Sequence, residues 1–152
     1  MPTSRRQRFS LKKFWHEHSL SVVAISILAL WFGLYCISDP KTHWGAFFGN
    51  AIADWSGTVV IVLATKFFIE RGSKESKQPK DNRTGFAKFL TEHSLTIFLV
   101  ATGLMWTALF MRSQTDSKWG QVAGNIVSEW VQTFGIIYLT KGLVERGSAE
   151  SK

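Results

Sequence analysis

The stretch that decides the fold is an octapeptide that occurs twice: residues 70–77 read ERGSKESK, and residues 145–152 read ERGSAESK. At the same offset of 75 positions (145 minus 70), residues 17–20 and residues 92–95 both read EHSL, and no gap is needed. A single register held over this distance indicates that one unit was duplicated whole. We therefore expect the two halves to share one internal structure and equivalent positions to do equivalent work.

Each unit contains two apolar runs of membrane-spanning length. They cover residues 20–37 and 46–69 in the first unit and residues 95–111 and 122–144 in the second. About 20 apolar residues, at about 1.5 Å each, cross a hydrocarbon core of about 30 Å. A helix of a soluble bundle would carry a polar stripe, which residues 22–35 lack. The sequence thus predicts an all-α integral membrane protein with four transmembrane helices.

The basic residues predict the orientation of these helices. Of the 18 Lys and Arg residues, only Lys41, Arg112 and Lys118 lie in the two short turns between spans, which leaves 15 (18 minus 3) on the opposite side. The positive-inside rule then places both termini and the central linker in the cytoplasm. We expect two tandem parallel hairpins in the plasma (inner) membrane, related by a pseudo-twofold axis along the membrane normal.

The net charge of +7 follows from the same bias. Basic residues on the cytoplasmic side favour anionic lipid headgroups as partners, besides the bilayer itself. We expect no nucleic-acid partner, because these residues do not alternate with aromatic or groove-reading elements on a folded face.

The duplication also predicts how the chain is divided. We expect a basic, amphipathic N-terminal segment, a first hairpin, a linker, a second hairpin with an amphipathic lead-in, and a short C-terminal end, at residues 1–19, 20–71, 72–88, 89–147 and 148–152 respectively. We interpret the linker as a solvated, mobile tether in preference to a specific partner site. Gly72 and Gly147 suit the C-terminal caps of the second and fourth spans.

Two sets of residues are candidates for anchoring and packing the spans. Tryptophans near the predicted membrane boundaries suit a half-wet, half-apolar setting: Trp15, Trp31, Trp44, Trp106 and Trp119. Small residues in the second span of each unit permit close helix contacts: Gly49, Ala53, Gly57, Gly124, Ser128 and Gly135.

A polar stripe in the second span of each unit is the most suggestive chemical feature. Its members recur at helical spacing: Asn50, Asp54 and Thr58 in the first unit, and Asn125, Glu129 and Thr133 in the second. A carboxylate inside the hydrocarbon layer costs a few kcal/mol, so it needs a partner, water or a proton. Two interpretations stay open. The acids carry a cation or a proton along a pathway, or they make hydrogen bonds that fix helix packing.

His18 and His93 are equivalent positions and weak candidates for the two axial ligands of a haem. Each stands beside a glutamate near the predicted cytoplasmic headgroups, where an amphipathic residue is ordinary. We therefore predict no cofactor and no metal.

Three functions follow from these patterns, in order of preference. Four spans leave little room for an internal pathway, so the first is a non-enzymatic packing or accessory subunit of a homo-oligomer or of a multisubunit membrane complex. The alternative is an oligomeric channel or a proton or cation pathway that uses Asp54 and Glu129. The third is a haem-binding electron-transfer subunit.

Overall fold

A computed structural model describes residues 11–73, 75–78, 84–114 and 116–143 of the 152-residue chain. Within these ranges the protein has five helices and no strand, as an all-α fold requires. The helices are α1 (Leu11–Ile37), α2 (His43–Phe67), α3 (Gly85–Glu92), α4 (Ser94–Arg112) and α5 (Lys118–Leu139).

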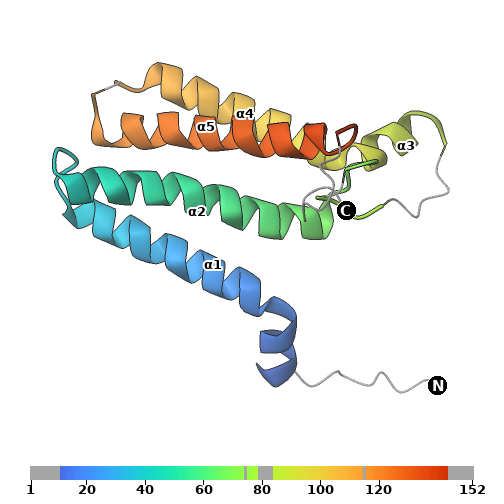
Figure 1. Ribbon diagram of the computed structural model, residues 1–152, viewed down its shortest axis with the longest axis horizontal. Coiled ribbons are helices and arrows are strands. Elements are labelled where there is room, and N and C mark those ends of the chain that lie inside the picture. Colours follow the sequence, from blue (N-terminus) through green and yellow to red (C-terminus); the bar gives the residue numbers. More distant parts are fainter. Residues whose placement is uncertain (1–10, 74, 79–83, 115, 144–152) are drawn as a thin grey trace, which may run out of the picture.

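The four long helices form two antiparallel hairpins, α1 with α2 and α4 with α5 (Figure 1). The second helices of the hairpins, α2 and α5, lie side by side at the centre and run in the same direction, while α1 and α4 lie on the outside. The short helix α3 lies at the end of the molecule where α2 and α5 finish. The two hairpins are thus parallel to each other.

The two hairpins turn in the same way, because the same residue types stand at equivalent positions. Thr42 and Ser117 cap α2 and α5, each accepting a hydrogen bond from the backbone N–H three residues on. Those residues are Gly45 and Gly120, and at both positions the start of the helix packs against the loop that precedes it. A Cβ atom on Gly45 would stand 1.9 Å from the carbonyl oxygen of Asp39, and one on Gly120 would stand 2.2 Å from that of Gln114. Only glycine fits either turn.

The core lies between the hairpins and at their inner contacts. Its most buried members include Tyr35 of α1, Leu95 and Leu99 of α4, and Ile137 of α5. The Tyr35 hydroxyl donates a hydrogen bond to the carbonyl of Lys118 at 2.5 Å, which joins the end of α1 to the start of α5. The core therefore binds one hairpin to the other as well as each helix to its neighbour.

Three of the helices, α1, α2 and α4, are long and apolar enough to cross a membrane. Helix α5 has 22 residues and is also long enough, but it does not reach the same apolar character. The reason is its polar residues, which include Lys118, Gln121, Asn125, Glu129 and Gln132. The structure therefore supports three of the four expected spans on length and composition.

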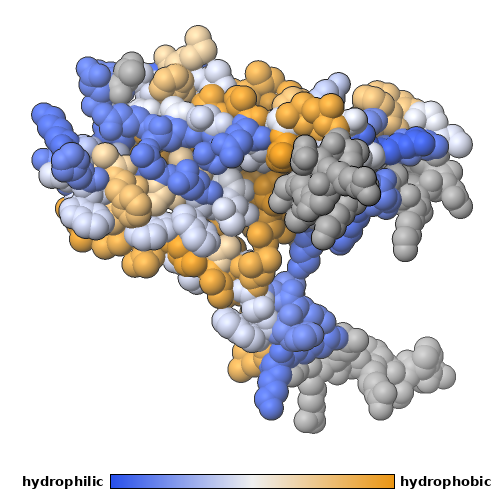
Figure 2. All heavy atoms as spheres, viewed as in Figure 1, coloured by the Kyte–Doolittle hydropathy of each residue, from blue (hydrophilic) through white to orange (hydrophobic). Residues whose placement is uncertain are grey.

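The surface agrees with a membrane setting for α1 and α4. Large apolar side chains are exposed along both helices, among them Leu20, Leu30 and Phe32 on α1 and Leu104 and Met105 on α4. Figure 2 shows apolar groups along much of α1, with hydrophilic groups over α5, at the start of α1 and near α3. Apolar surface this extensive is unusual on a soluble monomer.

Several boundaries differ from those expected. Helix α1 is continuous from Leu11, so the described part of the amphipathic N-terminal segment belongs to the first long helix, which bends near its start (Figure 1). The second amphipathic lead-in is a separate helix, α3, and it starts at Gly85 within the expected linker. Helix α2 ends at Phe67 with Phe68 as its cap, so assigning Gly72 as the cap is wrong. Gly147 lies outside the described residues.

The expectation of a solvated tether also fails for the start of the linker. Gly72 adopts a positive φ of 84°, in a turn that folds the octapeptide back onto the second hairpin. Ser73 next to it is fully buried, and its hydroxyl lies 3.3 Å from that of Thr140. Hydrogen bonds within the turn overrode a composition that is typical of a flexible linker.

Candidate functional site

The predicted polar stripes meet where α2 packs on α5. We call the surface formed by Asn50, Asp54, Thr58, Asn125 and Glu129 the α2–α5 polar face. At its centre the side-chain amide of Asn125 donates a hydrogen bond to the side-chain oxygen of Asn50, its equivalent in the first hairpin. Equivalent residues can meet in this way only where the two helices cross at matching depth. The structure therefore brings the two stripes together.

The two acids of the stripe also lie next to each other. The carboxyl groups of Asp54 and Glu129 are within hydrogen-bonding reach. One Glu129 carboxylate oxygen would lie 3.5 Å from a Cβ atom on Gly57, so the absence of a side chain at Gly57 makes room for this carboxylate. Two adjacent carboxylates repel when both are ionised, and one shared proton turns the repulsion into a hydrogen bond.

The α2–α5 polar face is only partly covered by the chain itself. Asn50, Asp54 and Thr58 are exposed, and Asn125 and Glu129 are half-buried. Thr133, the sixth predicted member, is buried and would lie 3.9 Å from a Cβ atom on Gly57, so it belongs to the interior of the contact. The Thr58 hydroxyl donates to the Asp54 carbonyl within its own helix at 3.1 Å.

The small residues proposed for packing fall into two groups. Cβ atoms on Gly49 and Gly124 would lie 3.1 Å from the Tyr35 ring and 3.0 Å from the Phe110 ring, which are equivalent contacts inside the two hairpins. Ala53 is buried as well. In contrast, Ser128 is exposed, and Gly135 has no neighbouring atom within 4 Å of a Cβ position.

The tryptophans also divide. Trp15, Trp44 and Trp119 are exposed, whereas Trp31 and Trp106 pack against the core cluster. The Trp31 indole nitrogen is buried with no hydrogen-bond partner among the described residues.

A second site, which the sequence did not suggest, surrounds Glu70 of the first octapeptide. The Glu70 side chain is fully buried, although it lies beyond the end of α2. Its carboxylate accepts hydrogen bonds from the Lys141 ammonium group, from His93 Nδ1 at 2.6 Å and from the backbone N–H of Thr96 at 3.1 Å. We call Glu70, His93, Thr96 and Lys141 the Glu70 cluster. It joins the end of the first hairpin to both long helices of the second.

The charges in the Glu70 cluster favour the ionised acid. Burial raises the pKa of Glu70, but hydrogen bonds from Lys141, Thr96 and His93 outweigh burial and hold the pKa below its ordinary value. The buried carboxylate is thus compensated by donors on three sides, which is the condition for a stable buried charge.

Backbone hydrogen bonds hold the octapeptide in this place. The N–H of Leu95 donates to the carbonyl of Ile69 at 3.0 Å, and the N–H of Arg71 donates to the carbonyl of Glu92 at 2.7 Å. The Arg71 guanidinium also pairs with the Glu92 carboxylate at 3.0 Å. These bonds use backbone groups at the break between α3 and α4, where the helical pattern is interrupted at His93.

The two histidines have different neighbours. His93 Nδ1 binds Glu70, whereas His18 Nδ1 lies 3.0 Å from the Lys66 ammonium nitrogen. His93 therefore contacts an acid from the first hairpin, whereas His18 contacts a lysine of its own hairpin. Within the described residues, no group of three or more His, Cys, Asp or Glu side chains is placed to hold a metal ion.

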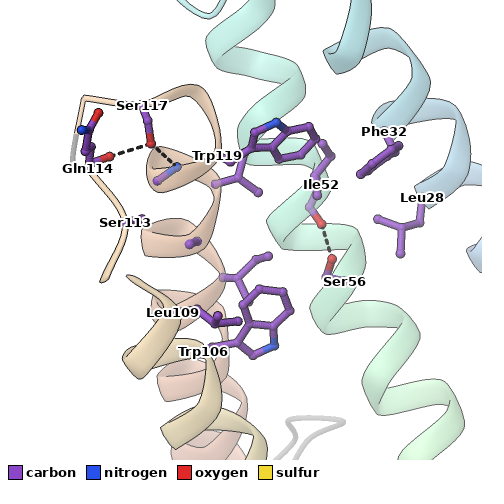
Figure 3. A pocket seen from close by; sticks show the side chains of 14 residues that line it. Leu28, Phe32, Ile52, Ser56, Trp106, Leu109, Ser113, Gln114, Ser117 and Trp119 are labelled. Atoms are coloured by element: carbon purple, nitrogen blue, oxygen red, sulfur yellow. Dashed lines mark hydrogen bonds between the residues drawn. The ribbon is translucent and has the colours of Figure 1, made fainter. Parts of the chain in front are cut away.

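An apolar cavity of about 680 Å³ opens between the two hairpins near their turns. Figure 3 shows Leu28 and Phe32 of α1 on one side of it and Trp106 and Leu109 of α4 on the other. The hydroxyl of Ser56 in its wall donates to the Ile52 carbonyl at 2.6 Å. Because its lining is almost wholly apolar, the cavity offers a ligand apolar contacts and few hydrogen-bonding groups.

One signal in the sequence could have identified the Glu70 cluster. Glu70, His93 and Lys141 each have a counterpart of the same type 75 positions away, at Glu145, His18 and Lys66. A charged set repeated as a whole points to a shared contact, but only the fold brings its members together.

Comparison of the chain with protein-family models, curated proteins and solved structures finds no match.

Proposed function

We propose that the chain is a four-span membrane protein without enzymatic activity, and that it packs as a subunit of a homo-oligomer through the α2–α5 polar face. The observation that carries this proposal is the exposure of Asp54 in the middle of a membrane-length helix. Asp54 lies 11 residues after the start of α2 and 13 before its end (54 minus 43 and 67 minus 54). At about 1.5 Å per residue, it is more than about 15 Å from either end.

An exposed carboxyl group at this depth cannot face lipid without cost. A charged side chain at the bilayer centre costs a few kcal/mol on insertion scales, and such residues usually face protein or water. A proton shared with Glu129 would lessen the cost for Asp54, but the side chains of Asn50 and Thr58 are exposed beside it. Covering the face with another protein surface removes these groups from lipid.

A second copy of this chain is the partner that fits the α2–α5 polar face. Asn, Asp, Glu and Thr side chains present both donors and acceptors, so the face can bind its own copy across a twofold axis. Polar side chains of these types are common between associated membrane helices.

The same packing accounts for the polarity of α5. Helix α5 lies between α2 and α4, and Asn125 and Glu129 are directed into its contact with α2. A span with protein on several sides needs less apolar surface than a span surrounded by lipid. The matching turns and the parallel hairpins support a duplicated four-span plan, and the positive-inside rule favours cytoplasmic termini in the plasma (inner) membrane.

The oligomer can be tested by cross-linking in native membranes. Cys36 is the only cysteine, so Cys36→Ser provides a background without thiols. In this background Thr58→Cys reports on the polar face, and Leu30→Cys is the matched control on the exposed side of α1, where Leu30 is 56% exposed. Mild oxidation should give a dimer with Thr58→Cys and little or none with Leu30→Cys. Light scattering on the wild-type protein in gentle detergent should give a mass of two or more copies.

Two results would contradict the homo-oligomer. A monomeric mass together with no cross-link at position 58 removes the covering second copy. Co-purification of a different membrane subunit that protects position 58 from thiol reagents would instead assign the face to a multisubunit complex.

The contact between Asp54 and Glu129 favours one alternative function, a proton or cation pathway in the oligomer. Two carboxyl groups that share a proton can pass it on when water reaches them. Proteoliposomes containing the purified protein should then show a proton or cation flux that Asp54→Asn and Glu129→Gln abolish. Absence of flux under both a pH gradient and a membrane potential rules the pathway out.

A further inference from the structure

We propose that the apolar cavity between the two hairpins binds an acyl chain of a phospholipid from the leaflet that contains the hairpin turns. The lipid phosphate then lies at the turn of the second hairpin. This inference rests on the membrane setting in the proposed function, but it does not depend on the oligomer.

The cavity has the size and the lining of a binding site for an apolar molecule. Its volume of about 680 Å³ lies within the range of about 300–1,000 Å³ that is usual for ligand pockets. Ile52 and Ala123 line it from α2 and α5, and Phe32 and Trp106 line it from α1 and α4 (Figure 3). Because all four long helices contribute, the packing of the two hairpins fixes the shape of the cavity.

The cavity is continuous with the apolar surface of the two outer helices. Phe32 of α1 and Leu109 of α4 line it and are also exposed on the outside of the molecule. In a membrane this surface faces lipid chains. An unfilled indentation would leave its lining atoms without dispersion contacts, and water is a poor occupant because it needs several polar partners. Lipid is therefore the occupant that the surroundings supply.

The cavity lies on the opposite side of α2 and α5 from the α2–α5 polar face. Along α2, Asp54 is two residues from both Ile52 and Ser56, and two residues turn an α-helix by about 200°. The same spacing separates Ala123 of the cavity from Asn125 of the polar face on α5. A second copy bound to the polar face thus leaves the cavity open to lipid.

The depth of the cavity matches the thickness of one leaflet. Gln114 and Ser117 line it at the turn of the second hairpin. Further in, its lining includes Leu28, nine residues before the end of α1, and Ser56, 13 residues after the start of α2 (37 minus 28 and 56 minus 43). At about 1.5 Å per residue these positions are about 14 and 20 Å from the turns, and half of a hydrocarbon core is about 15 Å.

The end of the cavity at the turn suits a phosphate group. Arg112 and Lys118, two of the three basic residues in the turns, stand next to the lining residues Ser113 and Ser117. Arg112 is exposed, and no carboxylate pairs with it in the part of the chain that the structure describes. The Lys118 ammonium group donates to two backbone carbonyls at the end of α1, which leave its charge in place. Basic groups at the headgroup end favour a phospholipid over an uncharged apolar molecule.

Retention of lipid through purification tests the proposal. Ala123→Phe places a ring in the cavity, and Ala101→Phe is the matched control, because Ala101 is exposed on α4 outside the lining. Each protein is washed with lipid-free detergent, and mass spectrometry measures the phospholipid that remains per chain. Wild type and Ala101→Phe should each retain a single phospholipid molecule, and Ala123→Phe should retain severalfold less.

Fluorescence quenching locates the lipid even if Ala123→Phe does not fold. Trp119 lines the cavity, whereas Trp15 lies at the far end of α1 from the turns. A phosphatidylcholine with brominated acyl chains is added to the washed wild-type protein in detergent. The part of the emission that Trp119→Phe removes should be quenched as this lipid binds, and the part that Trp15→Phe removes should not be.

Equal quenching of the two emissions overturns the proposal. Equal phospholipid contents of wild type and Ala123→Phe also overturn it, whether both proteins keep the lipid or both lose it, and so does recovery of a free fatty acid in place of a phospholipid. The Thr58→Cys cross-link reports on the oligomer separately. A cross-linked protein without the lipid contradicts the lipid site alone, and a monomer that keeps the lipid contradicts the oligomer alone.

Discussion

The cytoplasmic-facing ends of the two hairpins, as we orient them, carry nearly the same residues but are built differently. In the second hairpin, His93 and Lys141 surround the buried Glu70, and the helix is interrupted between α3 and α4. In the first hairpin, His18 and Lys66 contact each other, and α1 passes through the equivalent point as one helix. The EHSL tetrapeptide is the same at both places.

The difference lies in residues 69–71, which bond backbone groups at the point where the helix is interrupted. The N–H groups of Leu95 and Thr96, in the first turn of α4, donate to the Ile69 carbonyl and to the Glu70 carboxylate. These tertiary bonds replace helical bonds that a continuous chain would make at this point. Within the described residues, α1 has no such docked segment, so its backbone bonds stay within the helix.

Removing the buried Glu70 carboxylate should lower the free energy of unfolding more than any other change at these two ends. Glu70→Gln leaves Lys141 and His93 without their carboxylate, and breaking a buried ion pair costs about 3–5 kcal/mol. Glu17→Gln, the control change in the first hairpin, should cost less than about 1 kcal/mol, because the Glu17 carboxylate is exposed and its ion pair with Lys13 lies on the surface. Unfolding of both variants in detergent measures the two free energies. Equal losses would show that the two ends are equivalent after all.

Removing the lysine should have the next largest effect. Lys141→Met leaves the Glu70 carboxylate buried with fewer donors, at a cost of about 2–3 kcal/mol. Lys66→Met should change the free energy of unfolding by less than about 1 kcal/mol. The same unfolding measurement compares the two variants. A larger loss of stability for Lys66→Met would contradict the assignment of Lys141 as the partner of the buried Glu70 carboxylate.

The other ends of the hairpins allow a smaller and sharper test. Tyr35 donates to the Lys118 carbonyl, while its counterpart in the second hairpin is Phe110, which has no hydroxyl. Tyr35→Phe should reduce the free energy of unfolding by about 1 kcal/mol, since it removes one hydrogen bond and leaves the ring packed against Gly49. Phe110→Leu serves as a packing control. No loss in Tyr35→Phe would mean that water replaces the bond.

A change of pH within the neutral range should alter the free energy of unfolding less than any of these substitutions. The folded pKa of Glu70 lies below its ordinary value of 4.5, because hydrogen bonds from Lys141, Thr96 and His93 outweigh the opposing effect of burial. The stability from this group is therefore complete above pH 4.5 and is lost as pH falls below it. Wild type and Glu70→Gln should differ least in the most acidic buffer in which both fold. A difference that grows on acidification would contradict this sign.

Much of the fold could be predicted from residue patterns. The apolar runs predict helices, and the offset of 75 predicts equivalent turns, as Gly45 and Gly120 illustrate. The two polar stripes could also be predicted, but their meeting at Asn50 and Asn125 could not, because only the structure shows that α2 and α5 are adjacent. The exact helix ends and the burial of Ser73 could not be predicted, because composition reports flexibility only when no tertiary partner is available.

The sequence by itself determined the helical class, the hairpin plan and the repetition of the polar stripe, because spacing along a helix and a gapless repeat are local properties of the chain. Only the tertiary structure decided that Glu70 is a buried ion and that the helix breaks at His93. The EHSL tetrapeptide stands both inside the continuous α1 and at the interruption between α3 and α4, so local preference cannot distinguish the two places. The distinction comes from the backbone and charged groups of residues 69–71, which contact the second tetrapeptide from far away in sequence.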